Sequence, residues 1–271
     1  MTASPTAPFA SVSGNEKSAI EFDRASFSLN GRPLLHDLVL TVKHGETLVL
    51  LGRSGSGKTT TLKLINRLLL PTSGEVRVNG RRTEEWDPIR LRRGIGYVIQ
   101  DGGLFPHYTV ERNIALVPRI ENWPQPRVEA RVRELLATVG LSADLASRYP
   151  SQLSGGQRQR VGVARALAAD PPILILDEAF GALDPITRSE MQKEFRALQQ
   201  RMRKTVIFVT HDLREALLLA DRIALMEAGR LVVDLPVAEF LRSDDPLVRA
   251  YMEAFSAMPD SVMVPSNRDP K

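Results

Sequence analysis

Hydrophobic and polar residues alternate near the N-terminus, and this pattern predicts strands. Residues 20–27 and 38–42 follow it. Residues 47–51 form a short apolar, partly β-branched run that favours a buried strand, and residues 60–70 then have helical character. We therefore expect a small β-rich part, followed by a strand, a glycine-rich loop and a helix.

A second group of strands is predicted further along the chain. Residues 75–79 form a hairpin-like stretch, and residues 95–99 have the pattern of a buried strand that ends at Gln100. Residues 173–176 and 206–209 are apolar runs, and a helical segment follows each of them. Because alternating strands and helices are typical of a parallel sheet, the expected fold class is α/β.

The middle of the chain has a different texture. Apolar residues recur at helical spacing within residues 128–139 and 161–167, which predicts a mostly helical insertion over about residues 101–170. The predicted organisation is a disordered tail over residues 1–18, one domain over residues 19–255 that contains the insertion, and a short C-terminal tail over residues 256–271.

Composition narrows the possible functions. A chain of 271 residues with 43% hydrophobic and 25% charged residues has ordinary globular values. The net charge of +4 is too small to indicate nucleic acid as a partner, and the absence of cysteine excludes a disulfide framework and a cysteine nucleophile. No stretch approaches the roughly 20 apolar residues needed to cross a bilayer, so we expect any membrane role to depend on partner chains.

The clearest motif is GRSGSGKT at residues 52–59, which lies between a predicted strand and a predicted helix. Such a loop can curl so that successive N–H groups face phosphate oxygens, with Lys58 on the β and γ phosphates and Thr59 on Mg²⁺. A plain glycine- and serine-rich turn before a helix is the alternative. The predicted nucleotide-binding residues here are Gly52, Arg53, Ser54, Gly55, Ser56, Gly57, Lys58, Thr59 and Thr60.

Two carboxylates follow the apolar run at residues 173–176. Asp177 and Glu178 would lie at the C-terminal edge of a parallel strand, where α/β sheets bind ligands. Asp177 would hold Mg²⁺ through its hydration shell, and Glu178 would orient and polarise the attacking water. A strand that ends in a capping acidic pair would look similar. Together with Lys58, the pair indicates phosphoryl transfer.

The stretch LSGGQRQRVGVARALA at residues 153–168 carries a further signal. By local physics, Ser154 could cap a helix with Gln157 in a capping box. In sequence order, however, the motifs resemble those of the ABC ATPase family over about residues 20–255: the phosphate loop, Gln100, this signature, Asp177 and Glu178, Ala182-Leu183-Asp184, and His211. The resemblance implies a P-loop NTPase core with a parallel sheet, a β-rich antiparallel subdomain and a helical subdomain.

This resemblance also implies a head-to-tail homodimer with shared sites. ATP would lie between the phosphate loop of one chain and Ser154, Gly155, Gly156 and Gln157 of the other. Gln100 would sense Mg²⁺ and the water, and His211 would contact the γ-phosphate and Glu178. Taken singly, a Gln after a strand or a His before a helix is usually structural. The catalytic set implied is Glu178, His211, Gln100 and Lys58, and the metal set is Thr59, Gln100 and Asp177.

Further resemblance favours transport. ABC ATPases of DNA repair and ribosome binding typically carry long insertions or two cassettes, whereas this chain has one cassette. The run RRGIGYVIQDGGLFPHYTVERNIALVPRIENW is similar to the importers of glycine betaine, choline and related osmoprotectants, without CBS modules. The alternatives are an importer of another small solute, such as an amino acid, and, with less resemblance, an exporter or a non-transport ABC ATPase. The implied partners are a membrane permease and an extracytoplasmic solute-binding protein, with this chain at the cytoplasmic face of the inner membrane.

One position departs from the family pattern. Leu29 stands where the family usually has an aromatic residue that stacks on adenine. Base stacking contributes roughly 1–3 kcal/mol in nucleic-acid sites, whereas charge-assisted phosphate contacts are individually stronger. We therefore expect ATP binding with reduced selectivity for the base.

Overall fold

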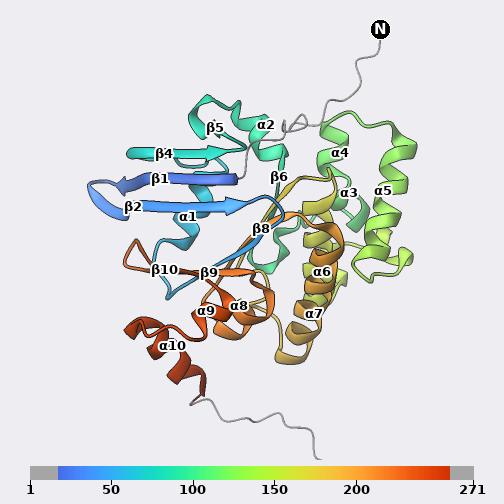
Figure 1. Cartoon of the computed structure of the whole chain (residues 1–271). Helices are drawn as coiled ribbons and strands as arrows, with labels where there is room; N and C mark the ends of the chain where they lie inside the picture. Colours follow the sequence, from blue (N-terminus) through green and yellow to red (C-terminus); the bar gives the residue numbers. More distant parts are fainter. Residues whose placement is uncertain (1–17, 257–271) are drawn as a thin grey trace, which may run out of the picture.

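The computed structural model describes residues 18–256, which form two sheets and a set of covering helices (Figure 1). The smaller sheet is antiparallel and has the strand order β2-β1-β4-β5. Its strands are β1 (Ser18–Leu29), β2 (Arg32–Lys43), β4 (Ser73–Val78) and β5 (Arg81–Arg82). The β-rich part predicted by the alternating pattern, and the antiparallel subdomain implied by the resemblance, are thereby confirmed.

The larger sheet has the order β10-β9-β3-β8-β7-β6. The five strands from β9 to β6 in this order run parallel to one another, and β10 pairs antiparallel with β9 at one edge. Its strands are β3 (Thr47–Leu51), β6 (Ile95–Val98), β7 (Ile173–Asp177), β8 (Thr205–Thr210), β9 (Arg222–Glu227) and β10 (Arg230–Pro236). The predicted parallel sheet is therefore present.

Helices cover both faces of the larger sheet. In Figure 1 the helices α3 to α6 gather on one side of the molecule, and α8, α9 and α10 lie at the opposite end from β4. The α-helices are α1 (Lys58–Ile65), α2 (Pro88–Arg93), α3 (Val110–Ile114), α4 (Leu116–Ile120), α5 (Gln125–Thr138), α6 (Gly155–Leu167), α7 (Pro185–Met202), α8 (Leu213–Leu219), α9 (Val237–Phe240) and α10 (Pro246–Ser256). Short 3₁₀ helices are η1 (Thr83–Glu85), η2 (Gln100–Gly103), η3 (Ala143–Ser147) and η4 (Pro150–Gln152).

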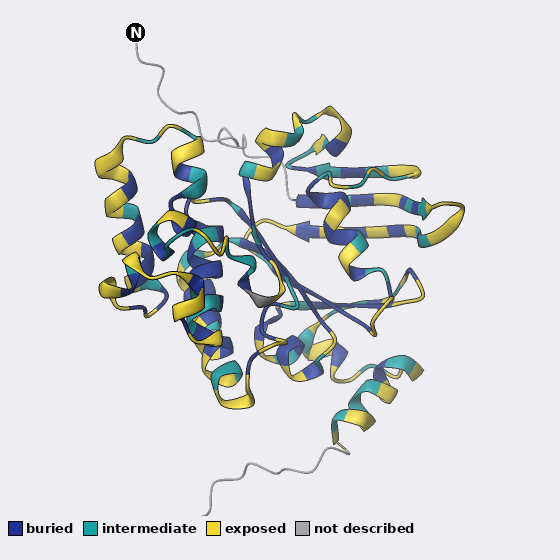
Figure 2. Ribbon diagram, turned by 180° about the vertical axis from the view of Figure 1, so that it is seen from behind, coloured by how far each residue is buried: buried dark blue, intermediate teal, exposed yellow. Residues whose placement is uncertain are grey.

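The larger sheet separates two hydrophobic cores, as the buried strands in Figure 2 show. Successive residues of a strand point to opposite faces, and β3 divides accordingly. Leu48 and Leu50 pack with the β1–β2 hairpin and α1, while Val49 and Leu51 pack with the helices on the other face. Because β3 is buried on both faces, its sequence is a continuous apolar run rather than an alternating one.

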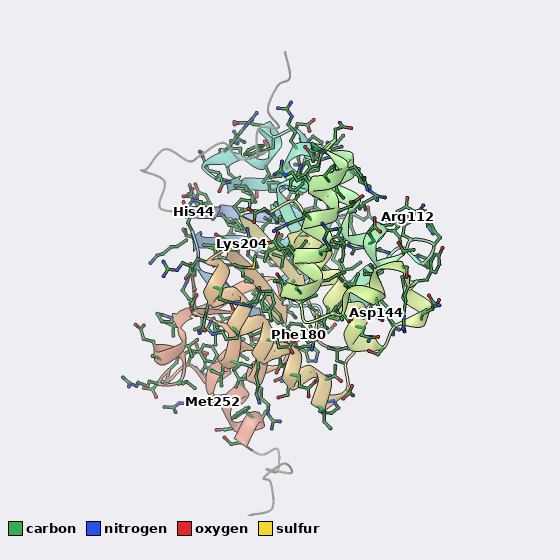
Figure 3. All side chains as sticks on the ribbon, turned by 90° about the vertical axis from the view of Figure 1, so that its right-hand side faces the viewer. His44, Arg112, Asp144, Phe180, Lys204 and Met252 are labelled. Carbon is green, nitrogen blue, oxygen red and sulfur yellow. The ribbon has the colours of Figure 1, made fainter. Side chains whose placement is uncertain are left out.

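An aromatic cluster ties the segment after β7 into the second core. Phe180 is fully buried and is labelled in Figure 3. Its ring centroid lies 5.6 Å from that of Phe208 on β8 and 5.9 Å from that of Phe195 on α7. Aromatic pairs at this spacing add to the stabilisation by burial. The two residues between Asp177 and Phe180 are therefore held between a strand and a buried anchor.

The sequence predicted one helix end wrongly. The pattern indicated a helix to residue 70, but α1 ends at Ile65. Arg67 has a left-handed φ of 55°, and the N–H of Leu68 turns back to the carbonyl of Lys63 at 2.9 Å. This closure satisfies a terminal carbonyl of the helix. Leu68 is 51% exposed, so the leucines beyond the helix end extended an apolar pattern without belonging to the core.

The predicted segment over residues 101–170 contains α3 to α6, η3, η4 and all but the first residue of η2, so it is mostly helical. The predicted tails fall almost entirely outside the described residues. Ser18 pairs with Lys43 in the first strand, and Ser256 ends α10, so both belong to ordered elements. Among the described residues, none of the helices has both the length and the apolar character to span a bilayer.

A glycine on β6 sets the distance between the larger sheet and α6. A Cβ atom at Gly96 would lie 2.4 Å from the carbonyl oxygen of Ala166 and 2.5 Å from a methyl group of Leu174. We expect Gly96→Ala to lower the free energy of unfolding by roughly 1–3 kcal/mol because the backbone of α6 must shift. Urea unfolding measures this, with Gly181→Ala as the control.

The control position is suitable because a Cβ at Gly181 would meet only the carbonyl of Glu178, at 3.4 Å. We expect Gly181→Ala to unfold close to the wild type. Equal unfolding midpoints for the two variants would contradict the close approach of β6 and α6.

Candidate functional site

The loop between β3 and α1 is curled at glycines, and Gly57 among them requires the absence of a side chain. Gly57, directly before α1, has a φ of 102°. A Cβ at this position would also lie 2.7 Å from a methyl group of Leu35 on β2. Both the left-handed backbone and the contact require glycine. The first N–H groups of α1 are therefore open toward the space above the loop, as an anion site at a helix N-terminus needs.

Lys58 lies under this loop and is only 4% exposed. Its ammonium group donates to the carbonyl oxygens of Gly52 at 2.7 Å and Arg53 at 2.9 Å. Burial lowers the pKa of Lys58, and the nearby carboxylates of Glu178 and Asp177 oppose this shift. The position of the ammonium is thus fixed by the loop that it supports. A buried cation next to curled backbone N–H groups is suited to phosphate oxygens.

Asp177 ends β7 at the same edge of the sheet. Its carboxylate accepts hydrogen bonds from the Thr59 hydroxyl at 3.3 Å and from the Tyr97 hydroxyl at 3.2 Å. Burial raises the pKa of Asp177, and these two hydrogen bonds oppose the shift. Burial and the neighbouring Asp177 likewise raise the pKa of Tyr97 far above its usual range, so the phenol stays a donor.

The pairing of Thr59 with Asp177 fits a magnesium ion. Mg²⁺ takes hard oxygen ligands, binds through one or two protein groups and keeps several waters or phosphate oxygens. A hydroxyl and a carboxylate that already face each other supply such a pair. These residues would hold the ion, which would neutralise phosphate charge there. Gln100 follows β6 and is exposed, and its metal role stays a prediction.

The Glu178 carboxylate has a different partner from the Asp177 carboxylate. Its backbone is left-handed, with a φ of 47°, a conformation that costs of order 1–3 kcal/mol in a non-glycine residue. Its N–H donates to the carbonyl of Val209 on β8 at 3.0 Å, and one carboxylate oxygen lies 3.5 Å from Nδ1 of His211. The abrupt turn after β7 thus sends two consecutive carboxylates to different partners. A strained backbone at this point is typical of a functional position.

Two adjoining cavities border these groups. The first, of about 180 Å³, is lined by the phosphate loop, Glu178 and Leu34 of β2. The second, of about 460 Å³, has Ser54, Glu178 and His211 on one side. Its other side is one face of α10, formed by Leu247, Ala250, Tyr251 and Ala254.

Sequence reasoning missed three of these contributors: Tyr97, Leu34 and the face of α10. The helical spacing of residues 247, 250, 251 and 254 could have identified α10 as an amphipathic helix, but not the part of the chain that this face borders. Tyr97 lies two residues before the end of a buried run, and only the pairing of β6 with β7 brings it to Asp177.

The predicted signature residues lie at the start of α6. Ser154 is the N-cap, and its hydroxyl accepts from the N–H of Gln157 at 3.2 Å. The side-chain carbonyl of Gln157 accepts in turn from the N–H of Ser154 at 2.9 Å. The capping box foreseen as the plain alternative is therefore present. Gly155 is exposed, and Gly156 is buried against Thr187, whose methyl group would lie 2.6 Å from an added Cβ.

The chain does not bring this signature to its own phosphate loop. Within residues 18–256, no hydrogen bond joins Ser154–Gln157 to the loop, and the two cavities described above are lined by other residues. The structure does bring together Lys58, Thr59, Asp177, Glu178 and His211. Leu29, predicted at the adenine end, is the last residue of β1 and is 53% exposed.

Comparisons with known proteins agree with this geometry. A family model described as "ABC transporter" matches residues 35–181. The chain is 52% identical over 202 residues to the glycine betaine/carnitine/choline transport ATP-binding protein OpuCA of Bacillus subtilis, which covers 74% of this chain and 53% of that protein. It is 49% identical over 213 residues to the glycine betaine uptake system ATP-binding protein YehX of Escherichia coli. This match covers 79% of this chain and 69% of that protein. The chain thus spans about half the length of OpuCA.

A solved structure has the same fold. The dimeric ATP-binding cassette MJ0796, in a post-hydrolysis state bound to ADP and Pi, has a TM-score of 0.72 at 32% identity. The match covers 80% of this chain and 98% of that one.

The Tyr97 hydroxyl offers a test of the metal assignment. We expect Tyr97→Phe to weaken binding of ATP with Mg²⁺ about fivefold, because loss of a hydrogen bond worth about 1 kcal/mol frees the Asp177 carboxylate. Binding of ATP without Mg²⁺ should not change. Nucleotide titration with and without the metal measures both, and Tyr149→Phe at a half-exposed position is the control. Equal weakening in both conditions would contradict the role of Asp177.

Proposed function

The chain belongs to the ABC transporter family, and from this membership and the site geometry we propose that it is the ATP-hydrolysing subunit of an importer. The observation that carries the proposal is the meeting of three groups at one sheet edge. The phosphate loop follows β3, the two carboxylates lie at the end of β7, and His211 follows β8. This edge is where open α/β sheets bind nucleotides.

Each residue would have a distinct part in hydrolysis. The loop N–H groups and Lys58 would hold the β and γ phosphates, and Thr59 with Asp177 would hold Mg²⁺. Glu178 would orient and polarise the attacking water. His211, 3.5 Å from the Glu178 carboxylate, would fix that carboxylate and contact the γ-phosphate. Phosphoryl transfer depends chiefly on such positioning and on charge stabilisation.

The site would be completed by a second copy of the chain. Ser154 and Gly155 are exposed, and no hydrogen bond within the described residues joins the signature to the phosphate loop. The second cavity, beside Ser54, Glu178 and His211, leaves room at the γ-phosphate end. The related cassette MJ0796 is dimeric, which supports a head-to-tail homodimer. In it, the N-terminus of α6 from one copy would face the nucleotide held by the other.

The cargo proposed is a glycine betaine- or choline-type osmoprotectant. Support comes from relatives at about 50% identity whose names include glycine betaine, carnitine and choline transport. Membrane permease subunits would form the pathway, and an extracytoplasmic binding protein would deliver the solute. This chain would then lie at the cytoplasmic face of the membrane. Cargo contacts would belong to those partners rather than to this chain.

Shared sites can be tested by complementation. Lys58→Ala disables the phosphate loop, and Ser154→Arg blocks the signature, so we expect each variant alone to hydrolyse almost no ATP. A mixture should recover hydrolysis, because a mixed dimer contains one site in which both halves are intact. Steady-state phosphate release from the mixture measures this. A mixture as inactive as its components would contradict the head-to-tail arrangement.

The cargo is tested by reconstitution of the chain with its permease and binding protein in vesicles. Glycine betaine or choline should stimulate ATP hydrolysis several-fold, whereas amino acids should not. Glu178→Gln in the same complex should abolish the stimulated rate while ATP still binds. Stimulation by another solute alone would overturn the cargo assignment and leave the ATPase assignment intact.

A further inference from the structure

Glu215 is a buried carboxyl that the proposed mechanism does not use. It lies on α8 and is only 3% exposed. One carboxylate oxygen accepts from the Gln192 amide on α7 at 2.9 Å, and the other accepts from the Thr210 hydroxyl at 2.5 Å. Burial raises the pKa of Glu215, and the bonds from Thr210 and Gln192 oppose this shift. Burying an acid is costly, so its partners indicate a specific role.

These contacts surround the backbone that carries His211. Thr210 ends β8 and Asp212 caps α8, so His211 is the single residue between them. The Thr210 hydroxyl accepts from the N–H of Asp212 at 2.9 Å, which closes a short turn across His211. The Asp212 carboxylate then accepts from the N–H of Arg214 at 2.7 Å. Side chains therefore hold the turn on both sides of the histidine.

The His211 side chain needs such support because it receives little from packing. It is 62% exposed, yet its Nδ1 lies 3.5 Å from the Glu178 carboxylate. An exposed ring can keep such a position only if its backbone is fixed. The side-chain hydrogen bonds of Gln192 and Thr210 to Glu215 fix this backbone. They join α7, α8 and β8, whose places in the fold are labelled in Figure 1.

We propose that Gln192, Glu215 and Thr210 form a positioning network that holds His211 against Glu178 during ATP hydrolysis. This inference rests on the proposed function, because it assigns the network a role through His211. Among residues 18–256, no hydrogen bond joins the side chains of these three residues to the phosphate loop, so they are positioning residues rather than catalytic ones. A purely structural network would support stability without acting on the hydrolysis step through His211.

Thr210→Val is the main test, because valine keeps the shape of threonine and removes the hydroxyl. We expect kcat to fall roughly tenfold, with ATP affinity unchanged, since the loosened turn affects the reacting geometry rather than nucleotide binding. Thr205→Val is the matched control. Thr205 lies on the same strand, is 2% exposed and also accepts from a backbone N–H, that of Gly45 at 3.0 Å, at the far end from the site. It should keep the wild-type kcat.

Three further variants test the network from its other members. Gln192→Met on α7 should lower kcat in the same way without altering β8. Glu215→Gln should restore most of the activity that Glu215→Ala loses, because an amide can still bridge Thr210 and Gln192. Urea unfolding and ATP titration of every variant separate lost positioning from lost structure. A wild-type kcat in both Thr210→Val and Gln192→Met would overturn the proposal.

A double-mutant cycle identifies the residue through which the network acts. In a His211→Ala background, Thr210→Val should cause almost no further loss of kcat, because the group that it positions is gone. An undiminished loss in that background would overturn the proposal even if the single variants behave as expected. If His211→Ala alone leaves hydrolysis unchanged, the proposed role of His211 fails instead. The two failures are thus distinguishable.

Discussion

The parallel pairing of β3 with β8, and of β8 with β7, is the constraint on which the whole site depends. Parallel neighbours end at the same edge of a sheet, so the segments that follow the three strands converge there. Asp177 pairs with Val209 at the end of this register. A shift by one residue would turn the Asp177 carboxylate from Thr59 toward the opposite face.

The charged side chains at this edge of the larger sheet act on their immediate neighbours. Asp177 and Glu178 are consecutive carboxylates, and both interact electrostatically with the Lys58 ammonium. That ammonium donates hydrogen bonds to the carbonyls of Gly52 and Arg53. Burial alone would drive Asp177 toward its neutral form, and the Tyr97 and Thr59 hydroxyls resist that change. A bound cation would act in the same direction as the two hydroxyls, because it also favours the ionised form of the carboxylate.

The sequence predicted the parts of the site that depend on local order. The loop glycines, Lys58 and the two carboxylates follow strands whose apolar runs are visible in the sequence, and the capping box at Ser154 needs only four consecutive residues. Contacts between distant segments were not predictable. Tyr97 and Asp177 are joined by strand pairing, and Thr210 meets Gln192 only through Glu215. The end of α1 was missed because the turn at Arg67 leaves leucines in helical register beyond it.

The capping box at the start of α6 has a consequence for affinity. The Ser154 hydroxyl accepts from the N–H of Gln157, and a hydroxyl that accepts one bond still has its own proton to donate. The side-chain amide nitrogen of Gln157 keeps its donors too, since only its carbonyl is used by the cap. A phosphate held by a second copy could therefore be met by donors that are already oriented, without breaking the cap. The conformational entropy of these two side chains is already lost when the helix folds. The association of two copies therefore does not have to compensate for that loss.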